Sequence, residues 1–205
     1  MASDIVTFHR QTLKHIGELM IEAGFEKLDP KGFVLRISPD IVGVVSLTVI
    51  TASRQEGMHV DPFLGVRHER LERLVSELTE LKFSPYANVT VHTALGYITP
   101  EAEYLSFPFD KDSAEEVSRE MVEMIVHYGI PWMKSFDSLE KMMLKIPEDS
   151  DMGRTRVPIH YFLKREFGSA KSAIERQLSI MADLGGPIEV QYKVFAKKFL
   201  AWLPK

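Results

Sequence analysis

The chain has 205 residues, of which 45% are hydrophobic and 26% are charged, and these are ordinary values for a globular domain. It contains no cysteine, which excludes disulfide bonds, thiolate catalysis and cysteine-ligated zinc. No apolar run approaches the roughly 20 residues that span a bilayer, and the first residues lack the features of a secretory signal, so we expect a cytoplasmic protein without a membrane partner.

The first half of the chain combines helical and extended patterns. Apolar residues recur at spacings of three and four through residues 5–23, which predicts a helix capped by Ser3 or Asp4 and ended by Gly24. The other predicted elements are strands at 32–37, 41–52 and 58–66, a helix at 68–81, and strands at 88–98 and 104–109.

From residue 112 onward the pattern is helical, with helices predicted at 112–128, 138–146, 158–167, 169–184 and 187–202 and a short turn at 131–136. Strands fill the first half without strand–helix–strand alternation. The predicted class is therefore α+β, a mostly antiparallel sheet packed with helices in the N-terminal half and an all-helical C-terminal half. We expect one domain over residues 1–205. If it subdivides into a body (1–146) and a helical segment (157–205), residues 147–156 are the predicted connection.

Charge is distributed unevenly, although the net charge is only −4. Residues 101–151 contain 13 acidic residues against 5 basic ones, whereas residues 152–205 contain 4 acidic residues against 10 basic ones. On the predicted helix 112–128, Glu116, Glu120 and Glu123 share one face. This face is either simply solvated or is a surface for a basic partner. The lysines of helix 187–202 either solubilise that helix, contact nucleic acid or pair with the acidic region.

The residues that could carry catalysis form no recognised motif. His59 and Asp61 lie on one face of a predicted strand, and together with His92 they are the candidates for a catalytic site. His68 and Glu72 share one helix face, which we interpret as a surface pair because no third metal ligand lies nearby. Phosphate-binding loops, a nucleophile elbow and a calcium loop are all missing from the sequence. We therefore predict no catalytic residue, no cofactor and no metal.

Three short segments carry a resemblance to a known group of proteins. The first helix ends in Ala-Gly-Phe at 23–25, a strand follows around Phe33, and the later helix runs into Tyr-Gly-Ile-Pro-Trp at 128–132. Over residues 10–145 this arrangement is similar to bacterial domains found among the immunity proteins of polymorphic and contact-dependent growth inhibition toxin systems. The resemblance implies a function by stoichiometric binding, often to a basic nuclease toxin whose active site is covered.

The leading hypothesis from the sequence is a non-catalytic inhibitor, an immunity protein that neutralises a cognate toxin with a basic surface. The predicted contact residues are the acidic side chains before and along helix 112–128, namely Asp110, Asp112, Glu116, Glu120 and Glu123. Nucleic acid is not an expected partner, because the acids beside Phe107 and Phe109 repel phosphate. The alternatives are a small metal-independent hydrolase or transferase, and a regulatory scaffold subunit.

Overall fold

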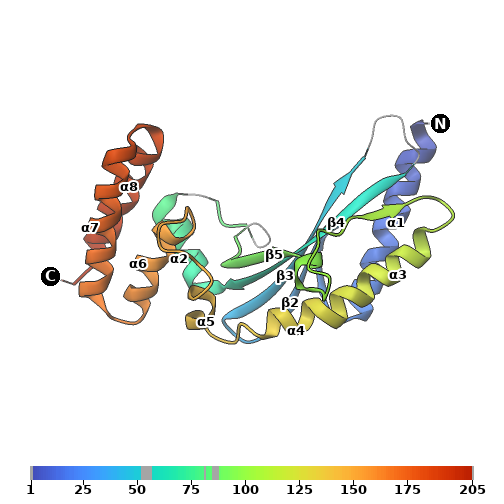
Figure 1. The fold of residues 1–205 in the computed structure, drawn as a ribbon, viewed down its shortest axis with the longest axis horizontal. Helices are drawn as coiled ribbons and strands as arrows, with labels where there is room; N and C mark the ends of the chain where they lie inside the picture. The colour runs from blue at the N-terminus through green and yellow to red at the C-terminus, as the bar shows by residue number, and fades with distance from the viewer. Residues whose placement is uncertain (1, 52–56, 81, 85–87, 205) are drawn as a thin grey trace. The chain divides into compact units, whose positions relative to one another are not determined.

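The computed structural model describes residues 2–51, 57–80, 82–84 and 88–204 and confirms the predicted α+β class (Figure 1). The chain divides into two compact units, each built from two stretches of sequence. Unit 1 comprises Met1–Arg67 and His92–Asp137, and unit 2 comprises His68–Val91 and Ser138–Lys205. The chain thus passes between the units at three places, none of which lies in the predicted connection at 147–156.

A six-stranded sheet has the order β1-β2-β3-β4-β5, with β6 paired to β4. Its strands are β1 (Glu26–Asp29), β2 (Gly32–Arg36), β3 (Ile41–Ile50), β4 (Met58–His68), β5 (Val91–Ala94) and β6 (Phe107–Phe109). The pairs β1–β2, β2–β3 and β4–β6 are antiparallel. The strand predicted over residues 88–98 is shorter than expected, because Leu95–Ile98 form the 3₁₀ helix η1. The described part of β3 and β4 is valine-rich and mostly buried, as expected for strands inside a sheet.

Two long helical stretches pack with this sheet in unit 1. Helix α1 (Ala2–Glu22) ends at Gly24, whose φ of 91° is the left-handed conformation that favours glycine. The caps predicted for this helix, Ser3 and Asp4, lie outside the residues whose side chains are described. Helix α3 (Ala114–Met124) packs against α1 and β6, and the two helices run side by side in Figure 1.

The turn predicted at residues 131–136 is wrong, because α3 continues through the π-helix η2 (Ile125–Gly129) into α4 (Ile130–Lys134). Proline lacks an N–H and its ring collides with the carbonyl four residues earlier in a regular helix. In the π-helix, the N–H of Ile130 instead bonds to the carbonyl of Ile125. This wider turn lets the helix accept Pro131 without ending.

Unit 2 is helical and has its own apolar core. Its helices are α2 (Glu69–Thr79), α5 (Leu139–Met143), α6 (Gly153–Leu163), α7 (Phe167–Leu184) and α8 (Gly186–Trp202). Helix α6 packs against α2 and α7, and α7 packs against α8. The core is formed by side chains from all of these helices, including Leu71, Leu78, Leu139, Ile159, Ile174, Phe195 and Phe199.

The segment predicted to be a connection, residues 147–156, is a tight turn that leads into α6. Ser150 closes the turn, since its Oγ donates to the Pro147 carbonyl at 2.6 Å and accepts from the Gly153 N–H at 3.0 Å. A Cβ on Gly153 would lie 2.1 Å from the Pro147 carbonyl oxygen, so the turn closes only around glycine. Helix α6 consequently begins earlier than its predicted start at residue 158.

Candidate functional site

The acidic residues predicted to contact a partner lie before α3 and on its outer face. Glu116, Glu120 and Glu123 are exposed, whereas Met121 and Ile125 on the opposite side are fully buried. Side chains three and four positions apart are neighbours on a helix, so the three carboxylates form one stripe. We call Glu116, Glu120 and Glu123 the acidic stripe. The predicted division of this helix into a buried and an acidic face is confirmed.

Asp110 orders the start of this helix. Its Oδ1 accepts hydrogen bonds from the Ser113 hydroxyl at 2.8 Å, the Ser113 N–H at 2.8 Å and the Asp112 N–H at 3.0 Å. The bonds from Ser113 hold the pKa of Asp110 below its usual value. Asp112 is exposed and donates its N–H to Asp110. Of the predicted contact residues, Asp110 therefore also has a structural role.

The acidic stripe has no cationic partner among the described residues. The nearest ion pair on α3 joins Glu115 and Arg119 at 3.4 Å, and both of these side chains are exposed. Seven described bases of the C-terminal region pair with acids of unit 2, in the pairs Arg154–Asp151, Arg156–Glu72, Lys164–Glu166, Lys171–Glu175, Arg176–Glu148, Lys193–Glu189 and Lys198–Glu80. Of these seven pairs, only Arg154–Asp151 and Arg176–Glu148 join a C-terminal base to an acid of residues 101–151.

The alternative catalytic candidates lie near a hydrogen-bonded cluster on β4. Asp61 is 3% exposed and accepts hydrogen bonds from the hydroxyls of Tyr104 at 2.5 Å and Ser106 at 2.6 Å. The bond to Asp61 raises the pKa of Tyr104. The Ser106 Oγ also lies 3.4 Å from Nδ1 of His59. His92 is exposed on β5, and no interaction in the described part of the chain joins it to this cluster.

The geometry of this cluster does not match a serine nucleophile with its base. In such a site the histidine bonds to the serine and the carboxylate orients the histidine. Here the carboxylate of Asp61 bonds directly to Ser106, and His59 is an exposed neighbour. The cluster instead ties residues 104–106 to β4. Sequence reasoning missed Tyr104 and Ser106, because they lie 43 and 45 positions from Asp61 and no local pattern links them.

His68 and Glu72 have separate structural roles in unit 2. The Nδ1 of His68 accepts the Leu71 N–H at 3.2 Å and so caps the start of α2. Glu72 is fully buried, where Arg156 binds its two oxygens at 2.7 and 2.8 Å and the Thr90 hydroxyl donates at 3.0 Å. The prediction of a surface pair is wrong, because Glu72 points into the interior toward an arginine 84 positions away.

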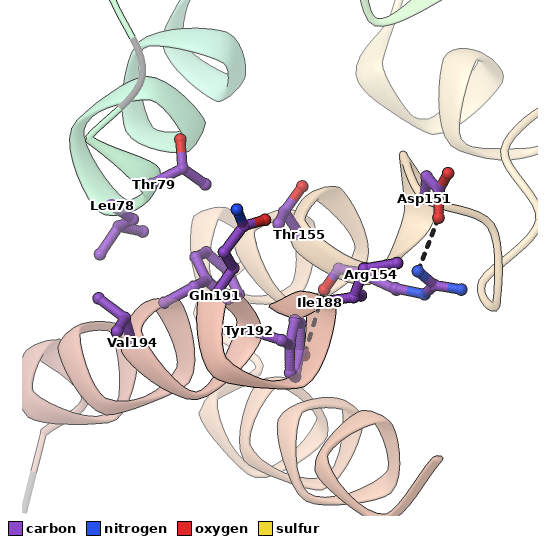
Figure 2. A pocket seen from close by; sticks show the side chains of 10 residues that line it. Leu78, Thr79, Asp151, Arg154, Thr155, Ile188, Gln191, Tyr192 and Val194 are labelled. Carbon is purple, nitrogen blue, oxygen red and sulfur yellow. Dashed lines mark hydrogen bonds and ion pairs between the residues drawn. The ribbon is translucent and has the colours of Figure 1, made fainter. Parts of the chain in front are cut away.

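Unit 2 also contains a pocket of about 420 Å³ between α2, the start of α6 and α8 (Figure 2). The polar groups at one end of the pocket already form hydrogen bonds with one another. The Tyr192 hydroxyl donates to the Arg154 carbonyl at 3.3 Å, and Nη1 of Arg154 donates to Asp151 at 2.6 Å (Figure 2). The carbonyl of Arg154 needs this partner because Pro158, four residues later, has no N–H to offer it.

The remaining pocket walls include Leu78, Ile188 and Val194, and the last two are exposed on α8. Helix α8 therefore carries exposed apolar side chains in addition to buried ones. The hydrophobic periodicity of α8 could not predict which of its apolar residues are exposed, because apolar side chains occupy both its buried and its exposed sides.

No protein-family model, no curated protein and no solved structure matches this chain. Within the part of the chain that the structure describes, no helix has the length and apolar character to cross a membrane. His, Asp and Glu side chains of the same described residues do not gather in groups of three or more that could hold a metal ion. The fold defines the class of the protein as α+β.

Proposed function

We propose that this protein is a non-catalytic inhibitor that binds a cognate toxin domain with a basic surface, as immunity proteins do. The observation that carries the proposal is the acidic stripe, whose three exposed carboxylates have no cationic partner among the described residues. Like charges at this spacing destabilise a helix by a few tenths of a kcal/mol per pair. A partner that supplies lysine or arginine side chains relieves this repulsion and gains a faster encounter.

The stripe is presented on a well-ordered support. Met121 and Ile125 anchor the opposite side of the helix in the core, and Asp110 fixes its first turn. Binding groups that are already held in place lose less conformational freedom on association. A row of carboxylates on a rigid helix also resembles the repeated charge of a nucleic-acid backbone, which suits the basic surface of a nuclease.

The test requires a toxin-like domain encoded beside this gene; that domain is purified and titrated with the full chain, and a metabolic operon in its place contradicts the proposal. The variant Glu116→Lys with Glu120→Lys reverses two charges of the stripe. Because electrostatic complementarity acts chiefly on association, we expect a Kd weakened by about ten-fold or more at low salt, with the difference shrinking as salt rises. Protection of cells that express the toxin domain should fall in parallel.

The matched control is Glu26→Lys with Glu77→Lys, which makes the same change in net charge at exposed positions of β1 and α2. This control should bind and protect like the unmodified chain. A stripe variant that folds normally and neutralises the toxin with unchanged affinity contradicts the proposal. Turnover of a metabolite by the purified protein contradicts it independently.

A further inference from the structure

Two tyrosines are exposed next to each other on the segment between β5 and β6. Tyr97 in η1 is 56% exposed and Tyr104 is 49% exposed. Their ring centroids are 6.4 Å apart and the ring planes are tilted by 57°, which is a favourable aromatic pair. Single exposed aromatic residues are common on protein surfaces, but a paired set forms a larger apolar platform of defined geometry.

The platform is held in place by the structure beneath it. The Tyr104 hydroxyl bonds to buried Asp61 at 2.5 Å, and Ser106 bonds to the same carboxylate at 2.6 Å. The segment also packs tightly onto η1, since a Cβ on Gly96 would lie 2.0 Å from the Glu103 carbonyl oxygen. With its hydroxyl occupied by Asp61, Tyr104 offers a partner the face of its ring.

The surroundings of the platform are acidic. Glu101 and Glu103 are exposed on the same segment, and residues 95–110 contain no lysine or arginine. Helix η1 packs against η2, which continues α3 directly. The tyrosine pair therefore lies near the C-terminal end of the helix that carries the acidic stripe.

We infer that Tyr97 and Tyr104 form an anchor site for an arginine side chain of the basic partner. This inference rests on the proposed function and names the chemistry of one contact. A guanidinium stacks on tyrosine ring faces and is attracted by their negative quadrupole, while Glu101 and Glu103 compensate its charge. The hydrogen bond from Tyr104 to a carboxylate increases the electron density of its ring and so strengthens this attraction. Tyrosine is also among the residues that most often dominate interface energies.

The experiment titrates the full chain, carrying ¹³C-labelled tyrosine rings and ¹⁵N-labelled amides, with an acetylated hexa-arginine amide followed by NMR. The ring signals of Tyr97 and Tyr104 should shift and saturate together with amides of the acidic stripe. Tyr97→Leu should weaken binding about two- to five-fold, the effect of one exposed cation–π contact. Tyr97→Phe should restore it. Trp202→Leu, which alters an exposed aromatic residue of unit 2, should have no effect.

The outcomes separate this inference from the function on which it rests. If the peptide shifts the acidic-stripe amides but not the tyrosine rings, and Tyr97→Leu binds normally, the anchor site is wrong and the acidic face stands. If Tyr97→Phe loses as much affinity as Tyr97→Leu, the contact is made by the hydroxyl and the stacking inference is overturned. If the peptide shifts neither the rings nor the stripe, the proposed basic partner fails as well.

Discussion

Replacing Arg156 with methionine tests how much the buried ion pair between Arg156 and Glu72 contributes to stability. Arg156 is on α6 with a side chain that is 11% exposed, and Glu72 is fully buried on α2. Methionine keeps much of the apolar stem of arginine but removes the guanidinium and both of its bonds to Glu72, at 2.7 and 2.8 Å. Among the residues that the structure describes, only the Thr90 hydroxyl then remains to satisfy the carboxylate.

The expected loss is large, because a buried charge without its partner typically costs about 3–5 kcal/mol. For a chain of this size, each kcal/mol shifts the melting temperature by roughly 2–4 °C. Arg156→Met should therefore lower the melting temperature by about 6–20 °C in a circular dichroism melt at neutral pH.

Two further variants make this measurement specific. Lys198→Met removes an ion pair of the same unit in which the partner, Glu80, is 71% exposed. Exposed pairs contribute about 0–1 kcal/mol, so the shift should stay below about 4 °C. Combining Arg156→Met with Glu72→Leu removes both charges and should recover most of the lost stability. The reasoning is refuted if Arg156→Met melts no lower than Lys198→Met, or if the combined variant is as unstable as Arg156→Met alone.

Two other changes probe buried and tightly packed positions of unit 2. Burial lowers the pKa of His160, so below its ordinary value of 6.5 the unfolded chain binds a proton that the folded chain does not. Stability is then lost as pH falls, and His160→Gln should flatten the loss seen in urea unfolding between pH 6.5 and about pH 5; an unchanged pH profile contradicts this. Gly153→Ala should cost about 1–3 kcal/mol in the same assay, because its Cβ meets two backbone carbonyls. Gly168→Ala has open space around its Cβ and should not destabilise, so equal losses at the two glycines would show that crowding is not the cause.

The sequence predicted the fold class because helix and strand periods are local signals. It failed where two prolines lie inside helices. Pro131 is accommodated by the π-helix before it, and Pro158 leaves the Arg154 carbonyl to the hydroxyl of Tyr192. In both cases the helix continues with a hydrogen bond outside the regular helical pattern, which the rule that proline ends a helix does not take into account.

The candidate site likewise has features that local sequence patterns predict and features that depend on contacts between distant residues. Helical spacing alone placed the acidic stripe on one exposed face, since three neighbouring positions on one helix need no knowledge of the tertiary structure. The partners of Asp61 and Glu72 come from distant parts of the chain, at Tyr104, Ser106 and Arg156. Which acidic residues become buried and paired depends on this long-range packing, so two carboxylates that look alike in the sequence have opposite environments in the fold.

The π-helix before Pro131 also rotates α4, which follows it directly. A regular helix completes five turns in about eighteen residues, so without the extra residue Met133 would face the same side as exposed Glu115. The additional residue turns Met133 by about 100°, onto the side of buried Met121. There its sulfur covers Gly43 of β3, where an added Cβ would lie only 2.6 Å away. Because of this one inserted position, a continuous helical stretch exposes the carboxylates of α3 and packs Met133 of α4 against the sheet.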